Sequence, residues 1–312
     1  MERKNDFPNT YREFIEMFPD DDACVAFLAK LRWPEGFICP ACKQASIPWN
    51  ANRDRLICPI CRHQTSVTAG TIFDKTRTPL KTWFEAAWHV STAKSGMSAK
   101  TLERTIGTSY KVAWMMLHRF RVAMVNNERS QLSGIVEVDE SFVGGETHGG
   151  KRGRGTGKSI VVIAVEIKQP KGFGRVRMRH IPDSSGDSLV PFICDMIAPG
   201  SVVRTDGWKG YNSVTDHGYQ REIIVQSSSG DPAHVSMPGV HRIASLFKRW
   251  ILGTHQGSVL PLHLQSYLEE FTFRFNRRTS RSRGLVFRRL IEQAVITKPT
   301  TMEDIIHGYD WN

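Results

Sequence analysis

Four cysteines fall into two closely spaced pairs in the first fifth of the sequence. Cys39 and Cys42 belong to CPAC, Cys58 and Cys61 belong to CPIC, and fifteen residues separate the pairs. This spacing is typical of zinc sites in which two tight turns each supply two thiolates to a tetrahedron. Four thiolates leave no open position on the ion, so we expect a structural zinc. A redox Cys-x-x-Cys motif or unliganded thiols are the alternatives, and two pairs in tandem favour zinc.

A second set of side chains combines two aspartates with a histidine and a lysine. In GIVEVDESFV, strand alternation places Asp139 on the face opposite the valines. Asp206 ends the apolar run SVVRTD just before a glycine turn, where an aspartate is often only a turn or cap residue. In PGVHRIASLFKRW, helical spacing aligns His241, Ser245 and Lys248 beside an apolar stripe. This histidine either packs or is directed at a ligand that the lysine also contacts.

The elements that would carry these residues follow a recognisable order. Four candidate strands are GIVEVDESFV, SIVVIAVEI, GRVRMRHIP and SVVRTD, and a helix is expected at 187–197 between the last two. The order β-β-β-α-β matches a ribonuclease-H-like core, in which the first two acids lie on neighbouring central strands and a later helix supplies the third ligand. We therefore predict an α/β fold with a ribonuclease-H-like mixed sheet flanked by helices, preceded by a zinc ribbon and a helix-turn-helix.

Composition shifts along the chain suggest five regions. They are a helical lead-in (1–32), the zinc ribbon (33–70), a helical region resembling a helix-turn-helix (71–133), the core (134–290) and a C-terminal tail (291–312).

Charge and hydropathy narrow the class of partner. The 312 residues include 42 Lys and Arg against 31 Asp and Glu, a net charge of +11. This excess indicates a polyanionic partner, nucleic acid first and an anionic membrane surface second; a basic enzyme without a nucleic-acid role is the alternative. The longest apolar run, SIVVIAVEI, is too short to span a bilayer, and no secretion signal is recognised. We expect a cytoplasmic, nucleoid-associated protein.

Residues 94–124 have the outline of a helix-turn-helix. Ser98 is a plausible N-cap, GTS forms a tight turn, and a longer helix follows that could enter a major groove. Lys111, Arg119 and Arg121 would then contact the DNA backbone. Helical hairpins are common and most bind no DNA, so this signal needs the basic context and the neighbouring ribbon. The ribbon itself could bind DNA or serve a structural or protein-contacting role.

The stretch GGKRGRGTGKS resembles a P-loop but fails its spacing. The motif requires glycine at the position of Arg152, and a strand rather than a helix follows, so ATP binding is rejected. We predict a flexible basic loop in which Lys151, Arg152, Arg154 and Lys158 contact DNA phosphates. A solvated turn with incidental charge is the alternative.

With these motifs in place, the chain resembles DDE-type transposases of bacterial insertion sequences, in the fifteen-ninety-five group with an N-terminal zinc ribbon. The resemblance runs from about residue 33 to 290 and rests on CPAC…CPIC, HQTSVTAGTIF, TPLKTWF, VEVDESFVGG, RTDGWKGY and LGTHQGSVLPLHLQSYLEEFTFRFNRR. The family's catalytic set is two aspartates and usually a glutamate, with a basic residue seven positions later. Asp139, Asp206 and Lys248 match this set, whereas His241 stands at the glutamate position.

The histidine is a departure that affects the choice of metal. Neutral imidazole ligates Mg²⁺ poorly and Mn²⁺ better, so His241 would keep the geometry while lowering the charge of the site. Alternatively, His241 packs or caps its helix, and water or another acid completes the site. Glu269 and Glu270 are the nearest acids on a later helix, but YLEEFTF suggests structural roles for both.

The resemblance implies cutting of element ends and joining of their 3′-hydroxyls to target DNA, with two Mg²⁺ or Mn²⁺ ions bridged by Asp139. Asp206 and His241 would each hold one ion, and Lys248 would grip the adjacent phosphate. Two DNA ends must be held together, which implies a homodimer or larger assembly on double-stranded DNA. Further DNA contacts are expected from Arg249, Arg274, Arg277 and Arg278, although a solvated basic face would look the same.

Two other functions remain open at this point. A non-catalytic DNA-binding regulator derived from a transposase is favoured by His241 and opposed by the retained aspartates and Lys248. A structure-selective nuclease would share the metal site and lack only the joining step.

Overall fold

A computed structural model describes residues 6–51, 55–125, 129–144, 158–224, 237–257 and 259–309. The chain divides into two compact units, each considered separately here. Unit 1 comprises Met1–Asn126 and Ser280–Tyr309, and unit 2 comprises Asn127–Thr279 and Asp310–Asn312. Across the described residues, none of the helices has the length and apolar character that crossing a membrane requires.

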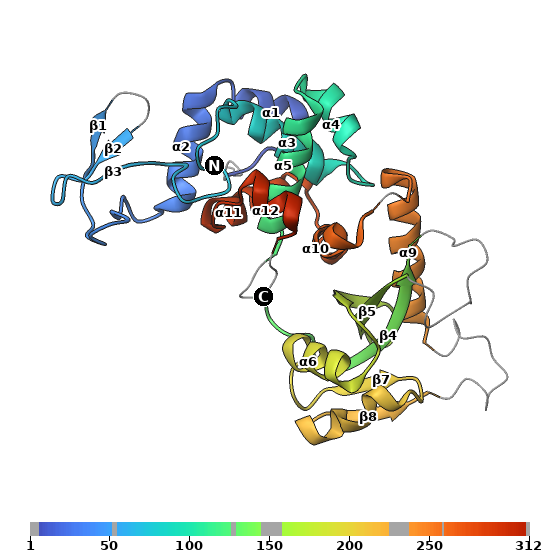
Figure 1. The fold of residues 1–312 in the computed structure, drawn as a ribbon. Coiled ribbons are helices and arrows are strands. Elements are labelled where there is room, and N and C mark those ends of the chain that lie inside the picture. Colours follow the sequence, from blue (N-terminus) through green and yellow to red (C-terminus); the bar gives the residue numbers. More distant parts are fainter. Residues whose placement is uncertain are drawn as a thin grey trace. The chain divides into compact units, whose positions relative to one another are not determined.

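Unit 1 is mostly helical, and several of its helices begin at a side-chain cap that the sequence provides (Figure 1). The Asp20 carboxylate accepts from the N–H of Ala23, and the hydroxyls of Ser98 and Ser109 cap two later helices in the same way. The helices are α1 (Tyr11–Met17), α2 (Asp21–Arg32), α3 (Leu80–Thr92), α4 (Ala99–Ile106), α5 (Tyr110–Ala123), α11 (Arg283–Ile296) and α12 (Met302–His307).

The predicted helix-turn-helix outline is present in α4 and α5. Gly107 ends α4 with a φ of 66°, a left-handed conformation that glycine adopts without strain. The first turn of α5 exposes Tyr110 and Lys111, whereas Met116 and Phe120 are fully buried. The surface that α5 offers to a partner is therefore concentrated at its N-terminal turn.

The cysteine-rich region forms a small antiparallel sheet in the order β1 (Trp49–Ala51), β2 (Arg55–Ile57) and β3 (Gln64–Ser66). Its buried cluster consists of Phe37, Cys39 and Cys58, with a few half-buried neighbours. So few apolar side chains cannot stabilise a fold alone, and the sheet needs a further stabilising element.

Helix α11 groups with unit 1, although the sequence analysis placed residues 280–290 in the core. The ring of Phe287 contacts those of Phe14, Phe84 and Trp88, with centroids 5.6 to 5.9 Å apart. An apolar helical stripe predicts that a helix is buried but not which partner buries it, so the sequence could not assign α11.

Unit 2 is built on a five-stranded mixed sheet in the order β6-β5-β4-β7-β8. The strands are β4 (Ile135–Val143), β5 (Ser159–Ile167), β6 (Phe173–Ile181), β7 (Val202–Thr205) and β8 (Gln220–Ile223). The first three strands pair antiparallel, while β4–β7 and β7–β8 pair parallel. The predicted β-β-β-α-β order is confirmed, and β8 is an additional strand.

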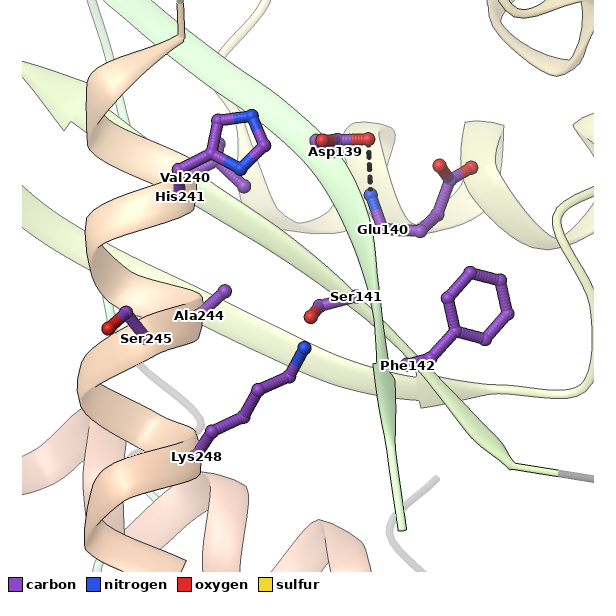
Figure 2. Close-up of a pocket in the computed structure, with 9 residues that line it drawn as sticks. All are labelled: Asp139, Glu140, Ser141, Phe142, Val240, His241, Ala244, Ser245 and Lys248. Carbon is purple, nitrogen blue, oxygen red and sulfur yellow. Dashed lines mark hydrogen bonds between the residues drawn. The ribbon is translucent and has the colours of Figure 1, made fainter. Parts of the chain in front are cut away.

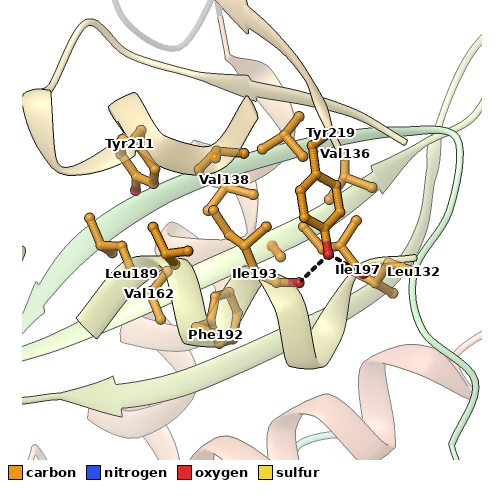
Figure 3. Packing of buried hydrophobic residues seen from close by; sticks show 14 of the residues in the cluster. Leu132, Val136, Val138, Val162, Leu189, Phe192, Ile193, Ile197, Tyr211 and Tyr219 are labelled. Carbon is orange, nitrogen blue, oxygen red and sulfur yellow. Dashed lines mark hydrogen bonds between the residues drawn. The ribbon is translucent and has the colours of Figure 1, made fainter. Parts of the chain in front are cut away.

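Helices cover both faces of this sheet. On one face lie α6 (Gly186–Met196) and the 3₁₀ helix η1 (Lys209–His217), packed over Val136, Val138 and Val203. Figure 3 shows this layer, in which the Tyr219 hydroxyl donates to the Ile197 carbonyl across 2.9 Å. On the other face, α9 (Pro238–His255) and α10 (Pro261–Asn276) bury the alternate residues of β5. The face of β4 that carries Asp139 is therefore also covered by a helix.

Gly210→Ala is expected to destabilise the protein by about 1–3 kcal/mol through overpacking. A Cβ at this position would lie 2.7 Å from the Ser184 carbonyl oxygen and 2.8 Å from Nε1 of Trp208. Gly253→Ala in α9 is the matched control, because no described atom lies within 4 Å of its Cβ position. The control should gain about 0.5–1 kcal/mol in helix stability. Denaturant unfolding measures both free energies, and equal changes in the two variants would contradict the packing described.

Candidate functional site

The two aspartates are brought together by the parallel pairing of β4 with β7. Glu137 pairs with Arg204 in this ladder, and carrying the register two residues further sets Asp139 beside Asp206, the residue that follows β7. Neighbouring strands lie about 4.8 Å apart, so the two carboxylates share one edge of the site. The sequence analysis predicted this placement on neighbouring central strands.

Each carboxylate is oriented by a local backbone donor. Oδ1 of Asp139 accepts from the N–H of Glu140 across 2.8 Å, and Oδ1 of Asp206 accepts from the N–H of Trp208 across 2.9 Å. Burial raises the pKa of Asp139, and the nearby negative charge of Asp206 raises it further, against opposing effects of the Glu140 N–H and His241. A cation placed between the two carboxylates would relieve this repulsion.

Helix α9 presents His241 and Lys248 toward β4, as its spacing predicted, whereas the Ser245 hydroxyl points away from this strand (Figure 2). Figure 2 shows the imidazole of His241 across from Asp139, and the ammonium of Lys248 reaching toward Ser141. Together the two elements line a cavity of about 500 Å³. Its lining residues are Asp139, Glu140, Ser141, Phe142, Val240, His241, Ala244, Ser245 and Lys248.

The imidazole of His241 has an unused nitrogen inside the protein. Its Nε2 atom is buried and has no hydrogen-bond partner among the described residues. Buried polar atoms are nearly always paired, so this atom is suited to a ligand that the cavity would admit. A divalent cation fits this donor set, which combines two carboxylates with one neutral imidazole.

The catalytic candidates are more open than a preformed metal cage. Within the described residues, the four cysteines are the group of metal-ligand side chains whose donor atoms all lie within 4.8 Å of one another. The carboxylate oxygens of Asp139 and Asp206 and the ring nitrogens of His241 are more widely spread than these sulfur atoms.

One lysine, Lys248, lines the cavity, and a second, Lys158, is near enough to affect it. Loss of hydration lowers the pKa of Lys248, and the positive charge of Lys158 lowers it further. Lys158 also lies against Gly144, just after β4. A phosphate bound beside Lys248 and Lys158 would offset the repulsion between their two ammonium groups.

The four cysteines form the second candidate site, with geometry suited to zinc. Sγ of Cys39 lies 3.6 Å from Sγ of Cys61, and Sγ of Cys42 lies 3.8 Å from Sγ of Cys58. A tetrahedron with Zn–S bonds of 2.3 Å has an edge of about 3.8 Å, close to both separations. The thiols are thus already arranged as a tetrahedral zinc shell.

The pKa values of these thiols also indicate a cation site. The N–H of Cys61 and, against burial, that of Ile60 lower the pKa of Cys58 to about 6. The N–H of Gln44 lowers the pKa of Cys42, but burial and the neighbouring thiols outweigh it and raise this pKa to about 12. Four such groups cannot all ionise together unless a cation compensates their charge.

The cationic residues predicted to contact DNA from α5 differ in their surroundings. Lys111 is exposed. Arg119 donates to the Ile72 carbonyl across 2.8 Å and lies over the ring of Trp83. Arg121 is only 1% exposed, so it cannot reach DNA in this structure, and we withdraw it from the contact set. Arg121 falls on the buried side of α5, which the sequence alone did not identify.

The arginines of α10 and its C-terminal end are also engaged within the protein. Arg274 pairs with buried Glu270 across 2.9 Å. Arg277 donates to the Phe273 carbonyl, and Arg278 donates to the carbonyls of Phe173, Gly174 and Phe275. Arg278 remains exposed on one side, as does Arg249 on α9. Lys151, Arg152 and Arg154 lie outside the described residues.

The nearest later acids are used structurally, as YLEEFTF suggested. Glu269 is 4% exposed and pairs with Arg129 across 2.8 Å, and fully buried Glu270 pairs with Arg274. Neither lines the cavity.

Sequence reasoning missed two residues beside the site. Glu137 is 2% exposed and accepts hydrogen bonds from the start of α9. Tyr211 is fully buried, and burial together with Glu140, Asp139 and Asp206 raises its pKa well above 10. Alternation already placed Glu137 on the face of Asp139, which was the available signal. For Tyr211 the available signal was its place at the end of the RTDGWKGY motif, which also contains Asp206.

Comparisons with known proteins identify both halves of this arrangement. Residues 131–276 match the ISXO2-like transposase domain, and residues 19–66 match the transposase zinc-ribbon domain. The chain is also 28% identical over 280 residues to an uncharacterized protein in transposable element ISH50 of Halobacterium salinarum. That alignment covers 83% of this chain and 92% of the relative.

The first match contains the sheet, both aspartates, His241 and Lys248, and the second contains the four cysteines. A zinc ribbon thus precedes a DDE domain in one chain, in the order that the sequence motifs indicated. The protein is a member of the IS1595 group of DDE transposases.

Proposed function

We propose that this transposase cuts the ends of its element and joins their 3′-hydroxyls to target DNA by two-metal phosphoryl transfer. The observation that carries the proposal is a cavity lined by Asp139, Lys248 and an imidazole with an unused nitrogen, with Asp206 in register beside Asp139. Two bound divalent ions, Mg²⁺ or Mn²⁺, would supply activation of the attacking oxygen and stabilisation of the leaving oxygen.

The protein's own groups divide the remaining work. The Asp139 carboxylate is near both Asp206, which follows β7, and His241 on α9, so it would be the group shared by the two ions. Asp206 and His241 would each hold one ion from opposite sides. No serine or tyrosine nucleophile is required. Water would attack the phosphate at the element end and release its 3′-hydroxyl, and this hydroxyl would then attack a target phosphate and displace a target 3′-oxygen.

Lys248 and Lys158 would hold the DNA strand. Their ammonium groups suit the phosphate beside the scissile bond, and binding it would offset their mutual repulsion. Lys111 and Arg249 are exposed and remain in the proposed DNA-contact set, together with the exposed side of Arg278. DNA affinity should then fall steeply as salt concentration rises.

The zinc ribbon and the helix-turn-helix would bind the terminal inverted repeats of the element. Joining requires two ends to be held at once, so we propose a homodimer or larger assembly on double-stranded DNA. The protein would act in the cytoplasm, where the nucleoid lies.

A second candidate is a non-catalytic DNA-binding regulator derived from a transposase. The observation that favours it is His241 at the position where the family usually has glutamate. Conversely, Asp139 and Lys248 both line the cavity that His241 faces, which supports a working site.

Asp139→Asn and Asp206→Asn should each lower cleavage of a labelled element-end duplex by at least about 10³-fold, because an amide is a poor ligand for a cation shared between carboxylates. Asp195→Asn is the matched control, since Asp195 is exposed and its carboxylate pairs with Arg179 at the surface. Duplex binding by all three variants should equal that of wild type. Full cleavage by Asp139→Asn would rule out the proposed site.

His241→Ala should lower cleavage by about 10²-fold or more, as expected when a positioned group in the active site is lost. His241→Glu should restore cleavage and raise the ratio of the Mg²⁺-supported rate to the Mn²⁺-supported rate, because carboxylate is the harder ligand. Both rates are measured on the same duplex. Equal cutting by wild type and His241→Ala would exclude a ligand role for the histidine, whereas a wild type that binds but never cuts would favour the regulator.

The purified protein should contain one zinc ion per chain, measured by elemental analysis, and Cys42→Ser should lose it. Chelation should melt the ribbon because its apolar core is small. Cys194→Ser is the control, since Cys194 lies in unit 2 outside the cluster. Zinc retained in full by Cys42→Ser would refute the four-thiolate site.

A further inference from the structure

The N-terminus of α9 is held by a side chain from the sheet. The N–H groups of Gly239 and Val240 both donate to Oε2 of Glu137, with N–O separations of 2.7 and 3.1 Å. More than a hundred residues separate donor and acceptor in sequence. All three residues are buried, so water does not substitute for this contact.

These two bonds replace a local helix cap. Met237 stands at the N-cap position and makes no side-chain capping bond, and Pro238 has no N–H to satisfy. The backbone N–H of His241 already donates to the Met237 carbonyl, with an N–O separation of 3.4 Å. Glu137 therefore satisfies both N–H groups of the first turn that would otherwise be buried without a partner.

The contact requires glycine at position 239. A Cβ there would lie 2.7 Å from Oε2 of Glu137 and 2.9 Å from Cδ1 of Ile167. The helix can approach the strand this closely only because Gly239 lacks a side chain. The approach distance is thus fixed from both sides, by an acceptor on β4 and by a glycine on α9.

This junction lies beside the candidate metal ligands. Glu137 precedes Asp139 by two residues and shares its strand face, because strand side chains alternate with period two. His241 directly follows Val240. The Glu137 carboxylate therefore links the two elements that carry these ligands, next to both of them.

We infer that Glu137 is a positioning residue that sets the distance between His241 and Asp139 by anchoring the first turn of α9 to β4. The inference rests on the proposed function for the purpose of the anchoring, while the anchoring itself can be tested without metal. Glu137 contacts neither ions nor DNA in this account, and it acts through His241.

The test uses the full-length protein and four single variants, and the metal titration adds a double variant and Asp139→Asn. Glu137→Ala removes the acceptor, and Glu137→Gln keeps an oxygen able to accept both N–H bonds. Gly239→Ala leaves the acceptor but forces the helix away. Glu166→Ala is the matched control: Glu166 is another largely buried carboxylate of the sheet, and it holds Arg175 and the N–H of Ser133 instead of α9.

The first readout is amide hydrogen exchange of the metal-free protein. Glu137→Ala and Gly239→Ala should speed exchange in peptides covering residues 239–243 by at least about tenfold, and leave the last turn of α9 unchanged. Glu137→Gln and Glu166→Ala should leave the first turn protected. Unchanged exchange in Glu137→Ala would overturn the anchoring outright, whatever the protein does with metals.

The second readout is Mn²⁺ affinity, measured by titration of the full-length protein without DNA. Glu137→Ala and Gly239→Ala should each weaken Mn²⁺ binding by about 10–100-fold, the range for residues that orient a ligand. Their double variant should be weaker by less than the product of the two factors, because both changes break one contact. Glu137→Gln should stay within a few-fold of wild type, and Glu166→Ala should not weaken Mn²⁺ binding even if it lowers the melting temperature.

The two proposals fail in distinguishable ways. If wild type binds Mn²⁺, Asp139→Asn does not, and Glu137→Ala binds as wild type does, the positioning role is wrong while the metal site stands. If Asp139→Asn binds Mn²⁺ as tightly as wild type, the metal site itself is wrong, and the positioning role is overturned with it.

Discussion

The structure of the site depends on one constraint, the parallel register of β4 against β7. This register sets Asp139 beside Asp206 on adjacent strands, where burial and like charge raise the pKa of Asp139. Ionising both carboxylates of such a pair costs free energy, because the two negative charges repel each other, and a bound cation would reduce this repulsion. The sheet therefore holds two adjacent carboxylates that a divalent ion, in the function we propose, would stabilise.

The helices around the sheet turn this pair into a site. On one face, α6 and η1 pack over an apolar layer that includes side chains of β4 and β7, and this packing stabilises the positions of the two strands (Figure 3). On the other face, α9 packs through Ile243 and Phe247 and turns His241 and Lys248 toward β4. The apolar stripe of α9 fixes its rotation, while Glu137 fixes its start. Packing and a buried hydrogen-bonded junction thus control different degrees of freedom of one helix.

Much of this arrangement could be predicted from local patterns. Alternation in GIVEVDESFV placed Asp139, helical spacing placed His241 and Lys248, and the Cys-x-x-Cys spacing predicted the thiol cluster. The patterns failed where a partner distant in sequence decides the outcome. Burial of Arg121, the hydrogen bonds from Arg278 to Phe173 and Gly174, and the contact of Glu137 with α9 all depend on which surfaces meet. Strand β8 was missed because QREI lacks the alternating apolar pattern of a strand. Hydrogen bonding to β7 stabilises the extended conformation of these four residues instead.

The most direct test of the central claim is anomalous diffraction at the manganese edge from crystals soaked in Mn²⁺. We predict density for Mn²⁺ in contact with a carboxylate oxygen of Asp139, with Asp206 and the imidazole of His241 as further ligands. Mn²⁺ bound by these groups would establish how the sheet and α9 combine to form the site. Density that contacts Asp139 and Asp206 but leaves His241 unliganded would contradict the account of the histidine. Mn²⁺ found only elsewhere would contradict the site as a whole.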